Sequence, residues 1–254
     1  MKIEVVPTAR DLQPENLTGK TALVIDVLRA TSTIITALNN GCQAVFPVTT
    51  PEEALELRRR LSGPILLGGE RQGRRIEGFD LGNSPAEYPP EVVAGKKIIF
   101  TTTNGTRAIR ACTRAANLVI ASFLNAAAVV EFAAGTGTNI LVVCAGTRGH
   151  FSLDDILCAG LVVDRLLQRL RPAGLDPTVD DLGLAAVDLY HLYSNDIRAG
   201  VERSLHARRL KQMGFDEDIA LCTRVDCHPL VAIYHEGSVV PHSSGSTKGP
   251  TSGG

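Results

Sequence analysis

Short apolar runs alternate with longer amphipathic stretches over most of the chain. Six runs predict buried strands, because apolar side chains occupy consecutive positions in them: residues 23–27, 44–48, 64–67, 97–101, 118–121 and 140–144. The stretches between and after these runs have the apolar spacing of helices: 31–39, 51–61, 106–115, 125–134 and 153–170. This alternation of strand and helix predicts an α/β layered fold with a mostly parallel sheet.

The last third of the chain is more helical. Helical patterns at 184–193, 201–213 and 217–223 precede one more apolar run, 230–234, which we expect to add an edge strand. No Pro/Gly/Ser-rich linker divides the chain before this point, so residues 1–236 are predicted to form a single domain. Residues 237–254 are expected to be a disordered Gly/Ser-rich tail, since from 243 on the chain is too poor in apolar groups to offset the entropy of ordering.

Composition and charge narrow the classes of function. With 44% hydrophobic residues the chain can form a core, and a net charge of -1 provides no general basic field for nucleic acid or anionic membranes. No apolar run is long enough to span a bilayer, and the first residues lack the apolar segment of a signal peptide. The cysteines are scattered, unlike a disulfide framework, and we expect them to be reduced in a cytoplasmic protein.

Polar residues gather where the first predicted strand passes into a helix. Asp26 ends the strand, and Arg29, Thr31 and Ser32 follow at the expected helix start. In open α/β sheets ligands bind at the carboxyl ends of strands, where helix N-termini, hydroxyls and Arg side chains suit phosphate. Asp26 could hold a metal ion or act as a nucleophile. The same residues could also serve only as a helix cap and an ion pair.

Two further strand ends carry similar chemistry. Residues 101–107 read TTTNGTR, which is more hydroxyls than a plain helix cap needs, so this junction is predicted to bind an anion. After the strand at 140–144, Arg148 and Asp155 offer a cation and a carboxylate. Cys144 is a weak candidate nucleophile, because the arginine that a cysteine phosphatase needs six residues later stands four residues later.

The segment from Gly68 to Gly95 has no clear periodicity, and irregular connections of this length are usually functional. It contains Glu70, Arg71 and Asp80. An ordered loop that merely covers the sheet edge is the alternative.

Five blocks in this order are similar to the 2-phosphosulfolactate phosphatase family: VIDVLRATSTIITALNNG at 24–41, GGERQGRRIEGFDLGNSP at 68–85, TTTNGTRAI at 101–109, SFLNAAAVV at 122–130 and CAGTRGHFSLDDILCAG at 144–160. A further stretch at 204–226 resembles the C-terminal region of that family. The resemblance implies a three-layer α/β/α architecture with a mixed six-stranded sheet. It also implies a Mg²⁺-dependent enzyme that hydrolyses 2-phospho-3-sulfolactate to 3-sulfolactate and phosphate, as in coenzyme M biosynthesis.

Under this reading the strand-end residues take specific roles. The expected catalytic residues are Asp26, Arg29 and Arg107. The expected substrate-binding residues are Thr31, Ser32, Arg71, Thr102, Thr103, Asn104, Gly105 and Arg148. The expected Mg²⁺ ligands are Asp26, Glu70, Asp80 and Asp155, because Mg²⁺ prefers hard oxygen ligands. Water, Asp26 and Cys144 stay open as nucleophiles.

Two alternative functions remain at this point. The enzyme could act on another small 2-phospho acid, or the chain could be a non-catalytic oxyanion-binding protein. In each case the expected partner is a small anion, without nucleic acid or membrane. A homo-oligomer is common for α/β enzymes of this size, and the sequence leaves the oligomeric state open.

Overall fold

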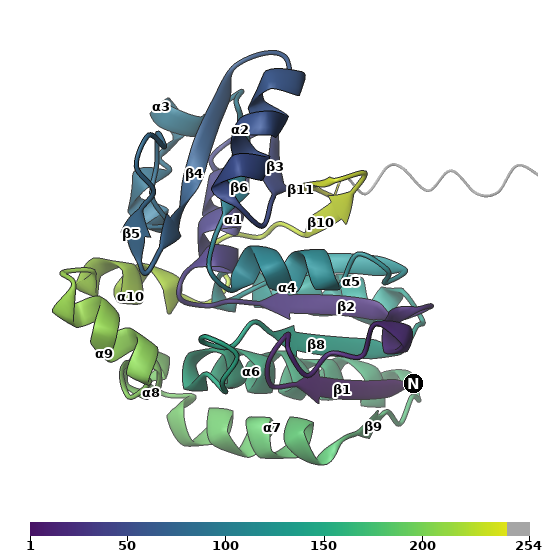
Figure 1. Ribbon diagram of the computed structural model, residues 1–254. Helices are drawn as coiled ribbons and strands as arrows, with labels where there is room; N and C mark the ends of the chain where they lie inside the picture. The colour runs from purple at the N-terminus through teal and green to yellow at the C-terminus, as the bar shows by residue number, and fades with distance from the viewer. Residues whose placement is uncertain (243–254) are drawn as a thin grey trace, which may run out of the picture.

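The strands alternate with helices along the chain as the apolar pattern indicates (Figure 1). The structure is a computed structural model, and it describes residues 1–242. The strands are β1 (Lys2–Val6), β2 (Thr21–Ile25), β3 (Ala44–Pro47), β4 (Ile65–Arg71), β5 (Arg74–Arg75), β6 (Lys97–Thr101), β7 (Asn117–Ala121), β8 (Ile140–Cys144), β9 (Thr178–Val179), β10 (Ala232–His235) and β11 (Ser238–Pro241).

The helices of the described residues differ widely in length. They are α1 (Ala30–Asn39), α2 (Pro51–Arg60), α3 (Pro90–Val93), α4 (Gly105–Ala111), α5 (Ala126–Gly135), α6 (Leu153–Leu170), α7 (Asp181–Tyr193), α8 (Ile197–Glu202), α9 (Leu205–Gln212) and α10 (Asp216–Cys222). Between residues 1 and 242, none of them has the length and apolar character that crossing a membrane requires.

The strands form one mixed sheet in the order β5-β4-β6-β3-β11-β10-β7-β2-β8-β1-β9. It contains two parallel blocks. The upper block is β4-β6-β3, and the lower block is β7-β2-β8-β1-β9. The hairpin β10–β11 lies between them and pairs antiparallel with β7 on one side and with β3 on the other.

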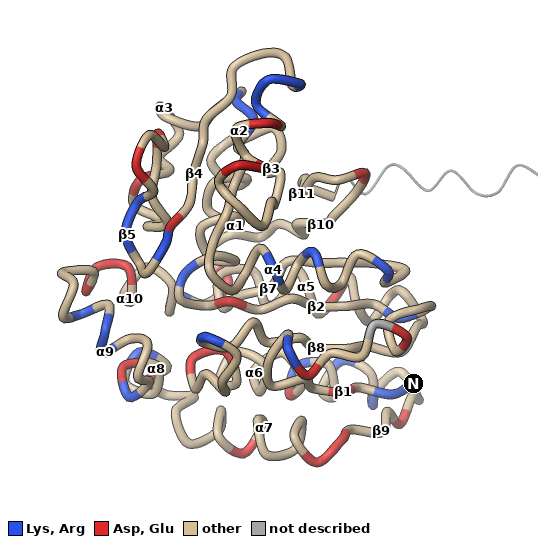
Figure 2. The backbone as a smooth tube through the Cα atoms, in the orientation of Figure 1, with Lys and Arg blue, Asp and Glu red and all other residues tan. Residues whose placement is uncertain are grey.

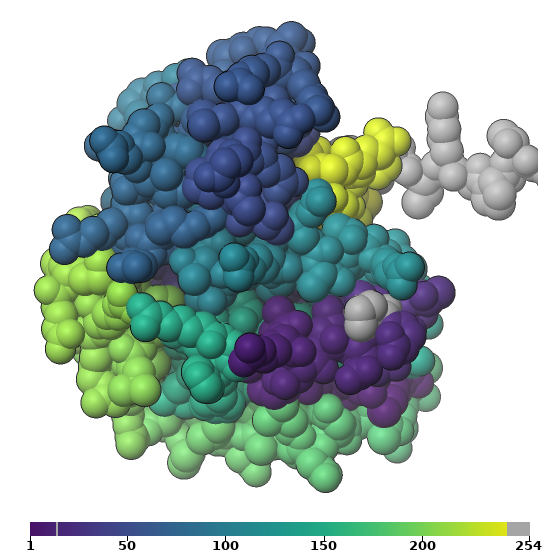
Figure 3. Space-filling model, in the orientation of Figure 1, coloured from purple at the N-terminus to yellow at the C-terminus, as the bar shows by residue number. Residues whose placement is uncertain are grey.

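The two blocks direct their strand ends towards one place. Figure 1 shows β4 of the upper block running down towards the end of β2 in the lower block. On the face shown in Figure 3, the blue segment around β5, the green-teal loop after β8 and the yellow-green helices α8–α10 meet, although they lie far apart in sequence. A site at this junction can therefore take residues from both blocks.

Side chains of successive residues on β2 alternate between two cores. Leu23 and Ile25 pack in a cluster that includes residues of α6, and Ala22 and Val24 pack in a cluster that includes residues of α1. Helices therefore cover both faces of β2, which explains why its sequence is apolar at consecutive positions.

The predicted α/β class and all six predicted strands are confirmed, but the strand count of six is wrong. The sheet has eleven strands in the described residues. The missed strands include β5 and β9, which have two residues each, and β1, which carries a lysine and a glutamate in its KIEVV sequence. The three-layer arrangement of the whole molecule stays a prediction.

Two boundaries in the C-terminal region also differ from expectation. The run at 230–234 corresponds to β10, which lies inside the sheet between β7 and β11 and is no edge strand. The predicted helix at 201–213 is divided into α8 and α9, because Ser204 interrupts it and caps α9 by accepting a 2.9 Å hydrogen bond from the amide of Ala207.

The predicted tail begins too early. Residues 238–241 form β11, where Val239 is fully buried and pairs with Val45 of β3. Gly237, at φ +88°, permits the tight turn that returns the chain from β10 into this strand. Residues 243–254 of the predicted tail lie outside the described residues.

Candidate active site

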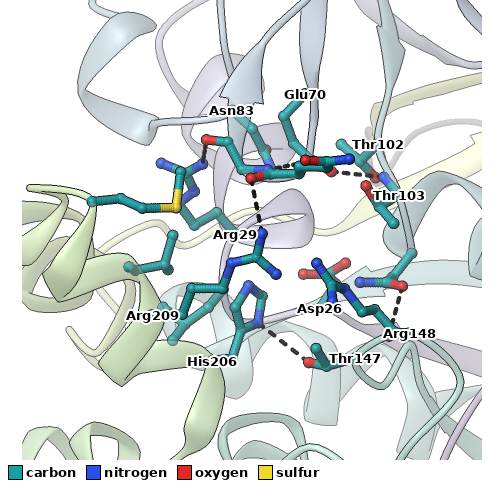
Figure 4. Close-up of a pocket in the computed structure, with 16 residues that line it drawn as sticks. Asp26, Arg29, Glu70, Asn83, Thr102, Thr103, Thr147, Arg148, His206 and Arg209 are labelled. Carbon is teal, nitrogen blue, oxygen red and sulfur yellow. Dashed lines mark hydrogen bonds between the residues drawn. The ribbon is translucent and has the colours of Figure 1, made fainter.

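One pocket lies where the ends of the two blocks meet, and Figure 4 shows its lining. The charged and polar side chains that line it are Asp26, Arg29, Glu70, Gln72, Asn83, Thr102, Thr103, Asn104, Thr147, Arg148, His206 and Arg209. Leu28, Gly73, Leu210 and Met213 complete the wall. We call this the reactive pocket. In Figure 2, acidic positions at the ends of β2 and β4 lie among basic positions on β5 and α9.

Asp26 follows β2 and is only 6% exposed. One oxygen, Oδ1, accepts a 3.2 Å hydrogen bond from the amide of Ala30, at the first turn of α1. Burial raises the pKa of Asp26 to about 7, and the nearby carboxylates of Asp154 and Glu70 act in the same direction. Keeping this buried carboxyl charged costs free energy unless a cation lies beside it. Without a cation it tends to take up a proton.

Glu70 is the second carboxylate of the pocket, and it fastens two loops. Its Oε1 accepts from the amide of Thr103 at 2.7 Å, and its Oε2 accepts from the amide of Gly73 at 2.6 Å. Glu70 lies on β4 beside β6, and Gly69 makes that approach possible: a Cβ there would lie 2.0 Å from the carbonyl oxygen of Thr101. The loop after β6 is thereby held at the pocket wall.

Two buried polar atoms in the pocket lining have no hydrogen-bond partner within residues 1–242. They are Oδ1 of Asn83 and Oγ1 of Thr103. Buried polar atoms are almost always hydrogen bonded, because leaving one unsatisfied costs about 1–3 kcal/mol. Two such atoms in one pocket therefore indicate that a polar ligand completes it.

The basic side chains of the pocket fall into two groups. Arg29 is buried, and its guanidinium already has partners within the protein. It forms a 2.6 Å ion pair with Asp218 and donates to the carbonyl of Gly73 at 3.0 Å. It also lies 4.2 Å from the ring centroid of Phe215. Within the described chain, Arg148 and Arg209 have no carboxylate within 4.0 Å. Their charges are the ones available to an anion.

His206 reaches the pocket from α9. Its Nδ1 lies 3.4 Å from Oγ1 of Thr147 and 3.8 Å from Oδ2 of Asp154. Burial lowers the pKa of His206, although the charge of Asp154 opposes the shift. The imidazole is thus held between a hydroxyl and a carboxylate, an arrangement that suits proton transfer.

The structure brings together seven of the residues expected from the sequence. Asp26, Arg29, Glu70, Thr102, Thr103, Asn104 and Arg148 all line the reactive pocket. The Thr102 hydroxyl already has a partner, because it accepts a 3.1 Å hydrogen bond from the amide of Thr106. In return, the Thr106 hydroxyl accepts from the amide of Thr102 at 3.0 Å. Among these seven, Thr103 has a side-chain oxygen that is buried and unpartnered.

The hydroxyls expected after β2 do not reach the pocket. Thr31 accepts from the amide of Asp26 at 3.0 Å and donates to its carbonyl at 2.8 Å, and Ser32 donates to the carbonyl of Val27 at 2.9 Å. Both side chains are fully buried and serve the backbone of their own loop. The prediction that they bind substrate is corrected for this reason.

Two of the four expected metal ligands also lie elsewhere. Asp80 accepts from the amide of Leu67 at 2.7 Å on the outer part of the upper block. Asp155 is buried, and its two oxygens accept from the amides of Val27 and Gly146 at 2.9 and 3.0 Å. These carboxylates hold backbone segments in place, and neither lines the reactive pocket.

The remaining expected residues have structural or neighbouring positions. Arg71 donates to the carbonyls of Glu70 and Thr49 and to the hydroxyl of Thr101. Arg107 lines an adjoining cavity rather than the reactive pocket. Gly105 lies against Asp26, since a Cβ at residue 105 would be 2.6 Å from Oδ2 of Asp26. Cys144 is fully buried and burial raises the pKa of its thiol well above the usual value, so it does not supply a thiolate nucleophile.

Sequence reasoning missed several pocket residues, above all Asn83, His206 and Arg209. His206 and Arg209 are three residues apart on α9 and therefore share one face of that helix. The helical spacing was visible in the sequence, but nothing in the sequence showed that this face meets β2 and β4. Asn83 lies in the irregular segment that was expected to be functional as a whole.

The donor set of the pocket fits a magnesium ion bound by few protein ligands. No cluster of three or more His, Cys, Asp or Glu residues suited to a metal occurs in residues 1–242. Asp26 and Glu70 nevertheless supply two carboxylates, and the unpartnered Oδ1 of Asn83 is a further hard oxygen. Mg²⁺ usually binds through one or two carboxylates, with water and substrate phosphate completing its octahedron.

Fold and pocket together define an α/β protein whose converging strand ends place two buried carboxylates beside arginines and a histidine. A model of the 2-phosphosulpholactate phosphatase family matches residues 6–237. A protein from Clostridium acetobutylicum named "Probable 2-phosphosulfolactate phosphatase" is 41% identical over 242 residues, which cover 94% of this chain and 100% of that protein. A protein of the same name from Caldanaerobacter subterraneus subsp. tengcongensis is 42% identical over 240 residues, 94% of this chain and 98% of its own. The chain belongs to the 2-phosphosulfolactate phosphatase family.

Proposed function

We propose that this protein is a Mg²⁺-dependent phosphatase that hydrolyses 2-phospho-3-sulfolactate to 3-sulfolactate and phosphate. The observation that carries the proposal is the pair of unpartnered buried oxygens, on Asn83 and Thr103, beside the carboxylates of Asp26 and Glu70. The substrate comes from the names of the relatives that match over almost their whole length.

The phosphoryl group lies among the cationic side chains of the pocket. Arg148 and Arg209 donate to its oxygens, and the Thr103 hydroxyl adds a neutral donor from the loop after β6. Glu70 positions this loop, because its Oε1 holds the Thr103 amide at 2.7 Å. Arg29 keeps α10 packed against the pocket through its ion pair with Asp218.

Asp26, Glu70 and Asn83 would hold the magnesium ion. When bound, the ion neutralises the charge of the phosphoryl oxygens. The carboxyl of Asp26, whose pKa burial raises to about 7, is then kept in its charged form by the neighbouring cation. Both oxygens of Glu70 already accept backbone amide hydrogen bonds, which orients this carboxylate before any ligand arrives.

His206 transfers the proton that the reaction needs. Hydrolysis breaks the bond between phosphorus and the C2 oxygen of the substrate, and that oxygen leaves as a hydroxyl of 3-sulfolactate. The protonated His206 side chain, oriented by Thr147 and Asp154, supplies a proton to the leaving oxygen. It is left as neutral imidazole, the form that burial favours, and it regains a proton from solvent before the next turnover.

The nucleophile is either Asp26 itself or a water molecule that Asp26 activates. In the first route an aspartyl-phosphate forms, and water then hydrolyses it to release phosphate; in the second route water attacks phosphorus directly. Rapid quenching followed by peptide mapping separates them: a phosphate on Asp26 supports direct attack, and a phosphate on any other residue removes Asp26 as the nucleophile.

The proposal is tested by measuring phosphate release from 2-phospho-3-sulfolactate with Mg²⁺ and with EDTA. We expect EDTA to abolish release and Asp26→Asn to lower kcat by about 10³-fold, the scale of a lost catalytic carboxylate. Asp80→Asn is the matched control, because Asp80 lies outside the pocket and an Asn can keep accepting from the Leu67 amide. Its rate should stay within about twofold of wild type.

Other results would select the other functions. Equal turnover of 2-phospholactate would indicate a phosphatase for another small 2-phospho acid. Ligand binding without release under any divalent metal would indicate a non-catalytic oxyanion-binding protein. We further propose that the reaction serves coenzyme M or sulfolactate biosynthesis in the cytoplasm.

A further inference from the structure

A second cavity adjoins the reactive pocket on the far side of the loop after β6. Its lining contains three arginines, Arg10, Arg107 and Arg148, from the loop after β1, from α4 and from the loop after β8. We call it the arginine cavity. Its other lining residues are Ala9, Thr103, Asn104, Ala111, Ala145 and Gly149.

The charges of the two sites differ in kind. The reactive pocket contains carboxylates and arginines, whereas no aspartate or glutamate lines the arginine cavity. Within residues 1–242, none of its three arginines has a carboxylate oxygen within 4.0 Å. Three like charges around one cavity repel each other, and an anion bound among them adds attractive interactions that offset this repulsion.

The arginine cavity is built rather than incidental. The guanidinium of Arg10 lies over the loop after β8, since a Cβ on Gly149 would be 3.2 Å from its Nη1. Arg148 adopts a left-handed backbone conformation at φ +55°, and its amide donates to Oδ1 of Asn104 at 3.1 Å. These contacts fix both arginine-bearing loops relative to the cavity wall.

The two sites are continuous. Thr103, Asn104 and Arg148 line both of them, so the loop after β6 and the Arg148 side chain face both sites. A ligand with two anionic groups a few atoms apart can place one group in the reactive pocket and the other in the arginine cavity. Reaction requires the phosphoryl group to lie beside Asp26 and Glu70, where a second anion would meet two carboxylates.

We propose that the arginine cavity binds the sulfonate of the substrate while the phosphoryl group occupies the reactive pocket. The inference rests on the proposed function and deepens it, because it names the part of the protein that distinguishes a sulfonated substrate from a plain 2-phospho acid. A sulfonate presents three equivalent oxygens, which guanidinium groups bind through paired N–H donors.

The selectivity ratio between two substrates tests this assignment. It is kcat/KM for 2-phospho-3-sulfolactate divided by kcat/KM for 2-phospholactate, which lacks the sulfonate. Arg107→Gln and Arg10→Gln should each lower this ratio at least tenfold, because each removes a cation that only the sulfonate contacts. Arg114→Gln is the charge-matched control: Arg114 follows α4 and lies outside the cavity lining, and its ratio should equal that of wild type.

An unchanged ratio in both Arg107→Gln and Arg10→Gln would overturn the proposal. So would an equal loss on both substrates, which would place these arginines on the phosphoryl or carboxylate group that the two substrates share. Melting curves of each variant show whether a loss of activity comes from unfolding instead.

Calorimetric binding of the product 3-sulfolactate separates this proposal from the proposed function. If wild type hydrolyses neither substrate, the proposed function is wrong. Binding of 3-sulfolactate that weakens at least tenfold in Arg107→Gln, with no such loss for lactate, would still support the sulfonate site. Binding that is indifferent to both arginine substitutions would overturn it.

Discussion

Two strand-to-helix junctions of this protein resemble each other in sequence and differ in what their hydroxyls do. After β2 the hydroxyl of Thr31 is consumed by the backbone of Asp26, at 3.0 and 2.8 Å. After β6 the hydroxyl of Thr103 is buried at the pocket and has no partner in the described chain. The first junction uses its hydroxyls to hold a carboxylate in place, and the second leaves one for a ligand.

The difference teaches that hydroxyl content alone does not identify a binding loop. What matters is whether the loop's own backbone satisfies the hydroxyl. The two junctions also meet directly, because Gly105 of the second lies against Asp26 and Ala30 of the first. The predictions below separate the two junctions or disturb the contact between them.

Among the changes that disturb the contact between the two junctions or separate their threonines, Gly105→Ala is expected to have the largest effect. The added Cβ would lie 2.5 Å from Cβ of Ala30 and 2.6 Å from Oδ2 of Asp26, too close for any ordinary contact. α4 or Asp26 must move, and a displacement of about 1 Å in a catalytic group lowers activity about 10²-fold. We expect kcat to fall by that amount and the melting temperature by several degrees, at a cost of about 1–3 kcal/mol.

Gly135→Ala at the end of α5 is the control. Nothing lies within 4 Å of a Cβ at that position, so neither kcat nor the melting temperature should fall. A Gly105→Ala variant with wild-type kcat would show that the contact between the two junctions is dispensable for activity.

The next prediction compares the change in the free energy of unfolding caused by Thr31→Val with that caused by Thr103→Val. Thr31→Val leaves the amide and carbonyl of Asp26 without their side-chain partner, so the free energy of unfolding should fall by about 1–3 kcal/mol. Thr103→Val replaces an unpartnered buried oxygen with a methyl group, so stability should be equal to or above that of wild type. Its kcat/KM should nevertheless fall about tenfold, because a donor to the phosphoryl group is lost.

Urea unfolding and steady-state kinetics on the same two variants test this pair. A loss of stability in Thr103→Val would show that its hydroxyl has a structural role, as that of Thr31 has. Wild-type kcat/KM in Thr103→Val would remove it from the substrate site.

The sequence was sufficient for the fold class and for the six strands whose apolar runs are continuous. It also pointed to two residues that line the reactive pocket: Asp26, which ends a predicted strand, and Glu70, which lies in the irregular segment that starts at residue 68. It could not assign Thr31 or Asp155, since their hydrogen bonds to Asp26, Val27 and Gly146 depend on how loops fold over one another. It could not find His206 either, because the approach of α9 to the pocket is set by packing of the whole C-terminal region.

The smallest effect is a pH dependence of stability that originates at the first junction. In the absence of divalent cations, the Asp26 carboxyl loses its proton near pH 4 when unfolded, and at about pH 7 when folded, because burial raises its pKa. Between these values the unfolded chain binds fewer protons than the folded chain, so this group makes stability fall as the pH rises from 4 to 7. Asp26→Asn removes that contribution.

Melting temperatures of wild type and Asp26→Asn in EDTA, from pH 5 to 8.5, measure the effect. The advantage of Asp26→Asn should grow up to about pH 7 and then level off, by a few degrees in all. Added Mg²⁺ should raise the melting temperature of wild type and leave Asp26→Asn nearly unchanged, since binding to the folded state alone stabilises it. A difference between the two proteins that is constant with pH would show that Asp26 is already charged in the folded protein below pH 7. The first junction would then stabilise the carboxylate through its own hydrogen bonds, without a cation.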